Sequence, residues 1–203
     1  GGWVARLQQL RQARTPVWGG VEGRTRIPGP GAVPAGAGLS RPLYLREVDG
    51  MPSPRGVRCH IAGVDLVRDH KGDFLVLEDN LRTPSGVSYV LANRAVMKRV
   101  LPDLFSGYAV RPVESYCHLL LRNLRWLAPE GVSDPTVVLL TPGIHNSAYY
   151  EHLYPAKEMG IELVEGTDLV VDQDMAFKPT PRSLRRLHGN YRRVTEELLP
   201  QTF

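Results

Sequence analysis

Three oxygen-bearing side chains in the first half of the sequence could together bind a metal ion: Asp65, Glu78 and Asn80. They lie on, or directly after, two β-rich segments, residues 60–67 and 73–78, which a glycine-containing turn joins into a hairpin. Carboxylate and amide oxygens without histidine or thiolate suit a hard cation such as Mg²⁺, which usually bridges substrate phosphates. The residue types therefore predict magnesium together with a nucleotide.

The register of this hairpin decides whether the three groups meet. We expect Arg68 to face Asp73 across a four-residue turn, which sets Asp65 opposite Val76 and diagonal to Glu78. Diagonal neighbours lie about 7–8 Å apart, a distance that a cation can bridge between two carboxylates. Two carboxylates on an otherwise apolar hairpin are costly unless a cation compensates them. The alternative is an exposed hairpin end at which the acids are only hydrated, and the spacing leaves both open.

The elements that follow the hairpin alternate between helix and strand. Apolar residues at steps of three and four predict helices, and a continuous apolar run predicts a buried parallel strand. With the helix after it, that strand forms a βαβ unit, so we expect an α/β fold. The expected elements are helices over 87–101 and 113–128, a strand over 136–140, a helix from an N-cap at Ser147 to a C-cap at Gly160, a strand over 161–164, and a second hairpin over 168–178.

Polar residues follow the predicted strand 136–140 at its carboxyl end, where open α/β sheets bind ligands. We expect Asn146, in this loop, to contact substrate, and His145 beside it either to do the same or to bond only backbone. Near the end of the chain, Arg192 and Arg193 could bind an anionic substrate, but a solvated basic end is the favoured interpretation.

The N-terminal part of the sequence predicts little regular structure. Residues 15–38 hold seven glycines and four prolines, which no regular element tolerates. We therefore predict a poorly ordered Gly/Pro-rich arm over residues 1–38 and one packed domain over residues 39–203.

Composition excludes several classes of protein. Two cysteines without metal-binding spacing exclude a disulfide framework and a zinc finger. No apolar run reaches the roughly 18 residues of a membrane span, and no secretory signal is visible, so we expect a cytoplasmic protein without a membrane partner. The formal charge of +4 is mild and the arginines are mostly scattered, so we expect no nucleic-acid partner.

Long motifs in the sequence resemble the circularly permuted ATP-grasp family, whose members are relatives of glutathionylspermidine synthase. The resemblance covers roughly residues 40–195. Its motifs are HIAGVDLVRD (60–69), VLEDNLRTPSGVSY (76–89), Asn93-Arg94, LTPG (140–143), NSAY (146–149), Glu151-His152, EMGIELVEG (158–166) and YRRV (191–194). The resemblance implies that part of a circularly permuted ATP-grasp fold is present, with a hairpin that carries the metal site and a βαβ unit like the pre-ATP-grasp unit.

The same resemblance assigns roles to individual residues. The magnesium ligands of the family fall on Asp65, Glu78 and Asn80, and the family's substrate carboxylate would be held by Thr83 and Ser85. Independently of the family, hydroxyl and free N–H groups ahead of the predicted helix 87–101 suit an anion, although turn and capping chemistry is the alternative.

Two departures from the family pattern also appear. Related synthetases place an arginine, which stabilises the transferring phosphoryl group, where this chain has Gly63, so Arg82 becomes the candidate catalytic arginine, with Arg68 as the other option. The sequence holds no Gly-rich, lysine-containing phosphate loop.

The resemblance implies an ATP- and magnesium-dependent carboxylate–amine ligase that acts through an acyl phosphate, of which this chain would be a fragment. Its partners would be the carboxylate of a small peptide or amino acid, an amine, and a chain that supplies the ATP-binding half. The alternative is a truncated, non-catalytic paralogue that serves as a binding module.

Overall fold

The computed structural model describes residues 54–57, 59–108 and 110–194. The chain divides into two compact units, Gly1–Arg58 and Cys59–Phe203. Within the described part of the first unit lies the short 3-10 helix η2 (Pro54–Gly56). The predicted arm over residues 1–38 and the predicted start of the packed domain at Leu39 lie outside the described residues.

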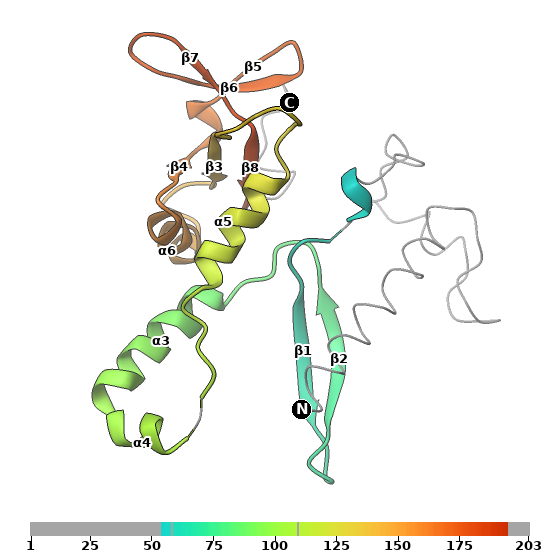
Figure 1. Cartoon of the computed structure of the whole chain (residues 1–203), viewed down its shortest axis with the longest axis vertical. Coiled ribbons are helices and arrows are strands. Elements are labelled where there is room, and N and C mark those ends of the chain that lie inside the picture. The colour runs from blue at the N-terminus through green and yellow to red at the C-terminus, as the bar shows by residue number, and fades with distance from the viewer. Residues whose placement is uncertain (1–53, 58, 109, 195–203) are drawn as a thin grey trace, which may run out of the picture. The chain divides into compact units, whose positions relative to one another are not determined.

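Two antiparallel strands, β1 (Gly63–Arg68) and β2 (Phe74–Asn80), form the predicted hairpin (Figure 1). Their register differs from the prediction. Arg68 pairs with Phe74, so the expected pairing of Arg68 with Asp73 is wrong.

The cause of this shift lies in the turn. The side-chain Oδ1 of Asp69 accepts hydrogen bonds from the backbone N–H groups of Lys71 (2.9 Å) and Asp73 (2.8 Å). An aspartate that bonds the backbone two and four residues further on makes its own turn geometry. With the backbone hydrogen bond from Asp69 N–H to Asp73 O (2.8 Å), these bonds close a turn that spans five residues, 69–73, instead of four.

An irregularity in β2 compensates for the longer turn. Asp65 pairs with Glu78 while the next residue, Leu66, pairs with Val76, so Leu77 is one extra residue in the ladder. Without it, Asp65 would lie opposite Leu77 and Glu78 would face the other side, because a one-residue slip reverses the facing of a whole strand. The extra residue thus returns the two carboxylates to one face, directly opposite each other and not diagonal as predicted.

A three-stranded parallel sheet forms the centre of the α/β part, in the order β4-β3-β8 (Figure 1). Its strands are β3 (Val137–Leu140), β4 (Glu162–Val164) and β8 (Gly189–Arg192). Every residue of β3 is buried, as the apolar run predicts, and the parallel pairing of β3 with β4 confirms the predicted βαβ unit. Strand β8 was not predicted; it occupies part of the segment interpreted as a solvated basic end.

Four helices lie between the hairpin and the end of the βαβ unit. Pro102, expected to end the helix that starts at residue 87, lies just past its end and in the first turn of the next helix, where proline is well tolerated. Gly160 adopts the predicted left-handed C-cap (φ +67°), whereas the N-cap is Ala148 and not Ser147. The helices are α3 (Val87–Val100), α4 (Pro102–Gly107), α5 (Tyr116–Trp126) and α6 (Tyr149–Met159).

The hydrophobic core lies around β3. One cluster of buried residues joins this strand to α3, α5 and α6, and a second joins it to β4 and the segments after it. The first contains Leu91, Cys117, Leu120, Leu124, Val137, Leu139, Ala156 and Met159, and the second contains Val138, Leu140, Val164, Leu169 and Leu187.

A second, antiparallel sheet contains β5 (Val170–Asp172), β6 (Met175–Pro179) and β7 (Leu184–Arg186). The predicted hairpin over 168–178 is confirmed by β5 and β6. Short 3-10 helix η3 (Gly166–Asp168) precedes it.

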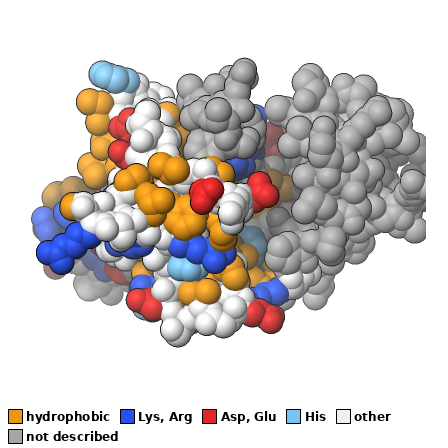
Figure 2. Space-filling model, turned by 90° about the horizontal axis from the view of Figure 1, so that it is seen from above, with side chains coloured by type: hydrophobic (Ala, Val, Ile, Leu, Met, Phe, Trp, Pro, Cys, Tyr) orange, Lys and Arg blue, Asp and Glu red, His pale blue; other side chains and the backbone are white. Residues whose placement is uncertain are grey.

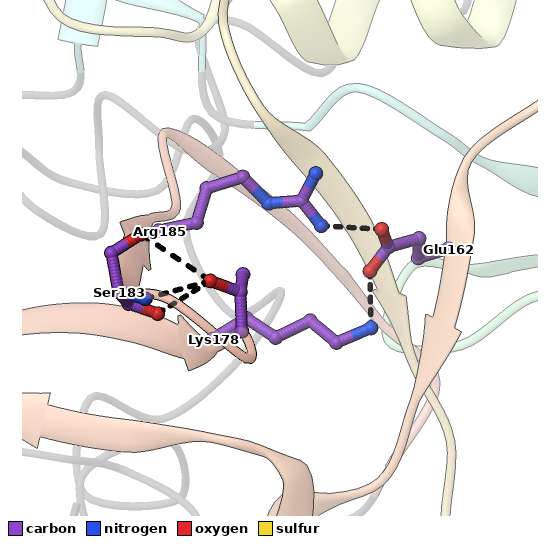
Figure 3. A network of polar contacts seen from close by, with 5 residues as sticks. Glu162, Lys178, Ser183 and Arg185 are labelled. Atoms are coloured by element: carbon purple, nitrogen blue, oxygen red, sulfur yellow. Dashed lines mark hydrogen bonds and ion pairs between the residues drawn. The ribbon is translucent and has the colours of Figure 1, made fainter.

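Figure 3 shows how this sheet is tied to the parallel one. Glu162 of β4 accepts hydrogen bonds from Lys178 of β6 and Arg185 of β7, and these bonds, the one from Lys178 first, lower the pKa of the Glu162 carboxyl. In the turn between β6 and β7, Thr180 Oγ1 donates to Ser183 O (2.7 Å) and closes the turn.

On the face drawn in Figure 2, basic side chains lie in separate groups among hydrophobic and acidic ones. Within the described residues, no helix has both the length and the apolar character needed to cross a lipid bilayer.

Candidate metal and substrate site

The hairpin brings Asp65, Glu78 and Asn80 together on one face. Asp65 is directly opposite Glu78, and Asn80 is opposite Gly63, two residues before Asp65 on the same side of β1. The amide Nδ2 of Asn80 donates a hydrogen bond of 3.0 Å to Asp65 Oδ2. This bond uses the amide N–H group and leaves the amide oxygen Oδ1 as the atom that Asn80 can offer to a cation.

This donor set fits a magnesium ion. It consists of two carboxylates and one amide oxygen, all hard oxygen ligands. All three residues are exposed, which suits an ion that keeps part of its water shell and is shared with substrate phosphates. The described residues contain no cluster of three or more His, Cys, Asp and Glu side chains that could hold a metal, so any site here depends on the amide as its third ligand.

The exposure of Asp65 and Glu78 removes one reason to expect a cation between them. Burial of the two carboxylates on an apolar hairpin would have made a cation necessary, and the structure places both in contact with solvent. The geometry therefore permits a cation without requiring one.

The loop from β2 to α3 carries Arg82, Thr83 and Ser85, and all three are exposed. Pro84 between them is held more firmly. Its carbonyl oxygen accepts a hydrogen bond of 2.8 Å from Arg193 Nη1. The loop thus offers two hydroxyl groups and a guanidinium directly after the face that carries Asn80.

Gly63, which stands where related synthetases have an arginine, lies against this loop. A Cβ atom on Gly63 would come within 2.8 Å of Pro84 Cβ, closer than carbon atoms pack. The absence of a side chain on Gly63 therefore lets the loop approach the hairpin, and an arginine would not fit here unless the loop moved.

If Thr83 and Ser85 hold a substrate carboxylate, as the family resemblance implies, Gly63→Ala should displace the 83–85 loop and raise the KM for that substrate about tenfold, because misplacing a binding group by about 1 Å has large effects. Steady-state kinetics check this. The matched control is Gly107→Ala, since a Cβ there would meet no atom within 4 Å. Equal KM values in the two variants would contradict the close approach.

The sequence predicted free backbone N–H groups at the N-terminus of α3 that could bind an anion. One of these N–H groups faces a side chain of the protein itself. The backbone N–H of Ser88, in the first turn, faces Glu151 Oε2 of α6 at 3.5 Å. Glu151 is only 4% exposed, and a carboxylate is stabilised at a helix N-terminus by the helix dipole. The Glu151 side chain thus occupies part of the position expected for a substrate anion. Thr83 and Ser85 remain the main candidates for binding that anion.

Arg193 was interpreted as part of a solvated end, and this interpretation is wrong. It follows β8, its backbone N–H donates to Leu140 O (2.9 Å), and only 8% of it is exposed. Arg192, by contrast, is exposed. Sequence reasoning named Arg193 but missed its burial because β8 is short, although the motif YRRV of the family resemblance includes it.

Asn146 lies in the loop after β3, as predicted, but its contacts are local. Its Oδ1 accepts a hydrogen bond of 2.8 Å from the backbone N–H of Ala148, just before α6. This bond shapes the start of the helix and explains why Ser147 is not the N-cap. The prediction that Asn146 binds substrate stays a prediction.

A buried histidine lies beside this loop. His152, only 2% exposed, forms a 2.7 Å hydrogen bond through Nδ1 with Thr141 Oγ1 at the end of β3. Burial lowers the pKa of His152 below its usual value, and the charge of Arg193 adds to this, while Glu151 opposes it. His152 is therefore neutral in the folded protein near pH 7.

The lowered pKa of His152 predicts that acid destabilises the fold. The unfolded protein binds a proton at this histidine near pH 6.5 and the folded protein does so only at lower pH, so stability is lost as pH falls below about 6.5. Urea titrations at pH 7.5 and pH 5.5 measure this loss. His152→Gln should reduce it, and His118→Gln, at an exposed position on α5, should not. If His152→Gln loses as much stability between pH 7.5 and pH 5.5 as the unmodified protein, His152 is not the cause of the loss.

Comparison with known proteins gives the family. A family model described as a circularly permuted ATPgrasp matches residues 6–203. An uncharacterized protein of Mycobacterium tuberculosis is 49% identical over 169 residues, which cover 83% of this chain and 31% of that protein. An uncharacterized protein of Synechocystis sp. is 47% identical over 184 residues, covering 90% of this chain and 38% of that protein.

A protein of Frankia alni, provisionally named glutamate–cysteine ligase 2-3, is 40% identical over 169 residues, covering 80% of this chain and 20% of that protein. The chain thus spans between 20% and 38% of the length of these three relatives. The match to the family model extends over nearly all of its residues. The chain therefore belongs to the circularly permuted ATP-grasp family.

Proposed function

We propose that this chain carries the metal- and carboxylate-binding part of an ATP-dependent carboxylate–amine ligase. The observation that carries the proposal is the gathering of Asp65, Glu78 and Asn80 on one face of the hairpin, with the 83–85 loop directly after it. The family supports the use of ATP and Mg²⁺, and the ligase name of the Frankia alni relative supports the reaction class.

In this proposal each group has a distinct task. Asp65, Glu78 and Asn80 hold a magnesium ion, which when bound neutralises the charge that develops on the ATP phosphates. Thr83 and Ser85 donate hydrogen bonds to the substrate carboxylate and orient one of its oxygens. The guanidinium of Arg82 stabilises the negative charge of the phosphoryl group during its transfer.

The proposed reaction has two steps. A carboxylate oxygen of the substrate attacks the γ-phosphorus of ATP, which forms an acyl phosphate and releases ADP. The amine then attacks the acyl carbon, which forms the amide and releases inorganic phosphate and a proton. The donor is the carboxylate of an amino acid or small peptide. Because the chain spans a minority of its relatives' length, the complete activity is proposed for the whole protein.

The test is phosphate release from ATP by the whole protein in the presence of Mg²⁺ and a panel of amino acids and peptides. We expect release to require both a carboxylate donor and an amine, and an amide product to form in equal amount. Phosphate release that needs neither the carboxylate donor nor the amine would contradict a ligase and indicate a simple ATPase. No release with any pair, from protein shown to be folded, would favour the non-catalytic binding module.

A further inference from the structure

The loop between β2 and α3 is held by a residue far away in the sequence. Arg193 Nη1 donates a 2.8 Å hydrogen bond to the Pro84 carbonyl, across 109 positions of sequence. Pro84 lies between Thr83 and Ser85, the two hydroxyl residues proposed to bind the substrate carboxylate. A shift of this carbonyl would therefore move both hydroxyl groups.

Arg193 is itself fixed at both ends. Its backbone N–H donates to Leu140 O at 2.9 Å, which continues the pairing of β8 with β3 beyond the last strand residue. Its guanidinium lies over the ring of Tyr191, 5.8 Å from the ring centroid. A cation near an aromatic face and largely excluded from water gains attraction from the ring. The arginine therefore transmits the rigid position of the parallel sheet to the loop.

Two further contacts hold the loop from other sides. Glu151 of α6 faces the backbone N–H of Ser88, five residues after Thr83. Gly63 of β1 leaves space for Pro84 to lie against the hairpin. Contacts from Arg193, Glu151 and Gly63 thus reach the loop and the first turn of the helix that follows it, and the bond from Arg193 to the Pro84 carbonyl is charge-assisted.

We propose that Arg193 is a positioning residue for the carboxylate substrate: it fixes the Pro84 carbonyl so that the hydroxyl groups of Thr83 and Ser85 are held in the geometry that binds the substrate. Arg193 does not itself touch the substrate, since it is buried and its guanidinium is engaged. This proposal rests on the ligase function proposed above.

The first experiment tests the contact without any activity. Hydrogen–deuterium exchange is measured on Arg193→Gln, Arg193→Lys and, as a matched control, Arg192→Gln, which loses the same charge at an exposed neighbouring position. We expect faster exchange in the 83–89 segment of Arg193→Gln, an intermediate rate in Arg193→Lys, and an unchanged rate in Arg192→Gln. Exchange in α5 reports on the overall fold and should stay constant. Unchanged exchange at 83–89 in Arg193→Gln would overturn the proposal.

The second experiment tests the consequence for substrate. In Arg193→Gln the KM for the carboxylate should rise about tenfold or more, with the KM for ATP and the affinity for Mn²⁺ unchanged, as expected when a charged hydrogen bond is lost. Arg193→Lys, which can donate to the same carbonyl, should recover part of the effect. Equal losses for all substrates, or no recovery in Arg193→Lys, would indicate a general role in folding and overturn the proposal. Absence of turnover in the unmodified protein would refute the ligase function itself, and the exchange result would still decide whether Arg193 holds the loop.

Discussion

Replacing Glu78 by Gln is expected to lower ATP-dependent phosphate release about 100-fold or more, because an anionic ligand of the proposed metal site becomes neutral and metal ions contribute several kcal/mol of charge stabilisation. Gln keeps the size and polarity of the side chain but removes the negative charge. The position is exposed, so the fold should be unaffected. Phosphate release at saturating ATP, and its dependence on Mg²⁺ concentration, measures the effect.

The neighbouring carboxylate provides the matched control. Asp79 pairs with Val64 and faces the other side of the hairpin, so Asp79→Asn removes the same charge one residue away from the proposed site. We expect Asp79→Asn to keep its activity within about threefold of the unmodified protein, because its side chain lies on the face opposite the proposed site. If both variants lose activity equally, the loss would reflect the charge or folding of the hairpin and not a metal site.

The largest expected effect on stability comes from Leu139→Ala. Leu139 is fully buried in β3, the central strand, and packs within the first core cluster. Removing its side chain leaves a cavity, and such substitutions cost about 2–5 kcal/mol. Urea denaturation of the variant measures the loss in the free energy of unfolding.

Leu119→Ala is the matched control for this measurement. Leu119 lies on α5 and is 45% exposed, so its truncation should change stability by only about 0.5 kcal/mol. The alanine also keeps the helix propensity of the position. Similar losses in the two variants would contradict the placement of β3 at the centre of the core.

The α/β part was largely predictable because its signals are local. The apolar run of β3, the helical spacing from residue 87, and the glycine after α6 each reflect the chemistry of neighbouring residues. Strand β8 escaped prediction because it has only four residues and is paired by a strand about fifty positions earlier in the chain.

The shared face of the three candidate metal ligands was predicted, but the strand register that produces it was not. Asp65, Glu78 and Asn80 share a face as expected, yet by a different route, since the Asp69 turn shifts the register by one residue and the extra residue at Leu77 shifts it by one more in the same direction. Each of these two features reverses the facing of a strand, and periodicity reports neither. The three side chains still share a face because two one-residue shifts together restore the original facing.

The buried polar residues around the loop were the least predictable. Glu151 and Arg193 are of residue types that ordinarily lie in water, and the sequence analysis favoured exposure for Arg193. Their burial depends on partners distant in the sequence, a helix N-terminus for Glu151 and the Pro84 carbonyl for Arg193. A structure was therefore needed to connect β8 with the proposed substrate loop.

The most direct test of the metal site is anomalous X-ray diffraction from crystals of the protein grown with Mn²⁺ and ADP, recorded near the manganese absorption edge. The account predicts an anomalous peak bounded by carboxylate oxygens of Asp65 and Glu78 and by Asn80 Oδ1, at distances of about 2.0–2.4 Å that hard oxygen ligands make. A Mn²⁺ ion that binds ADP elsewhere on the protein, with these three side chains in contact only with water, would contradict it.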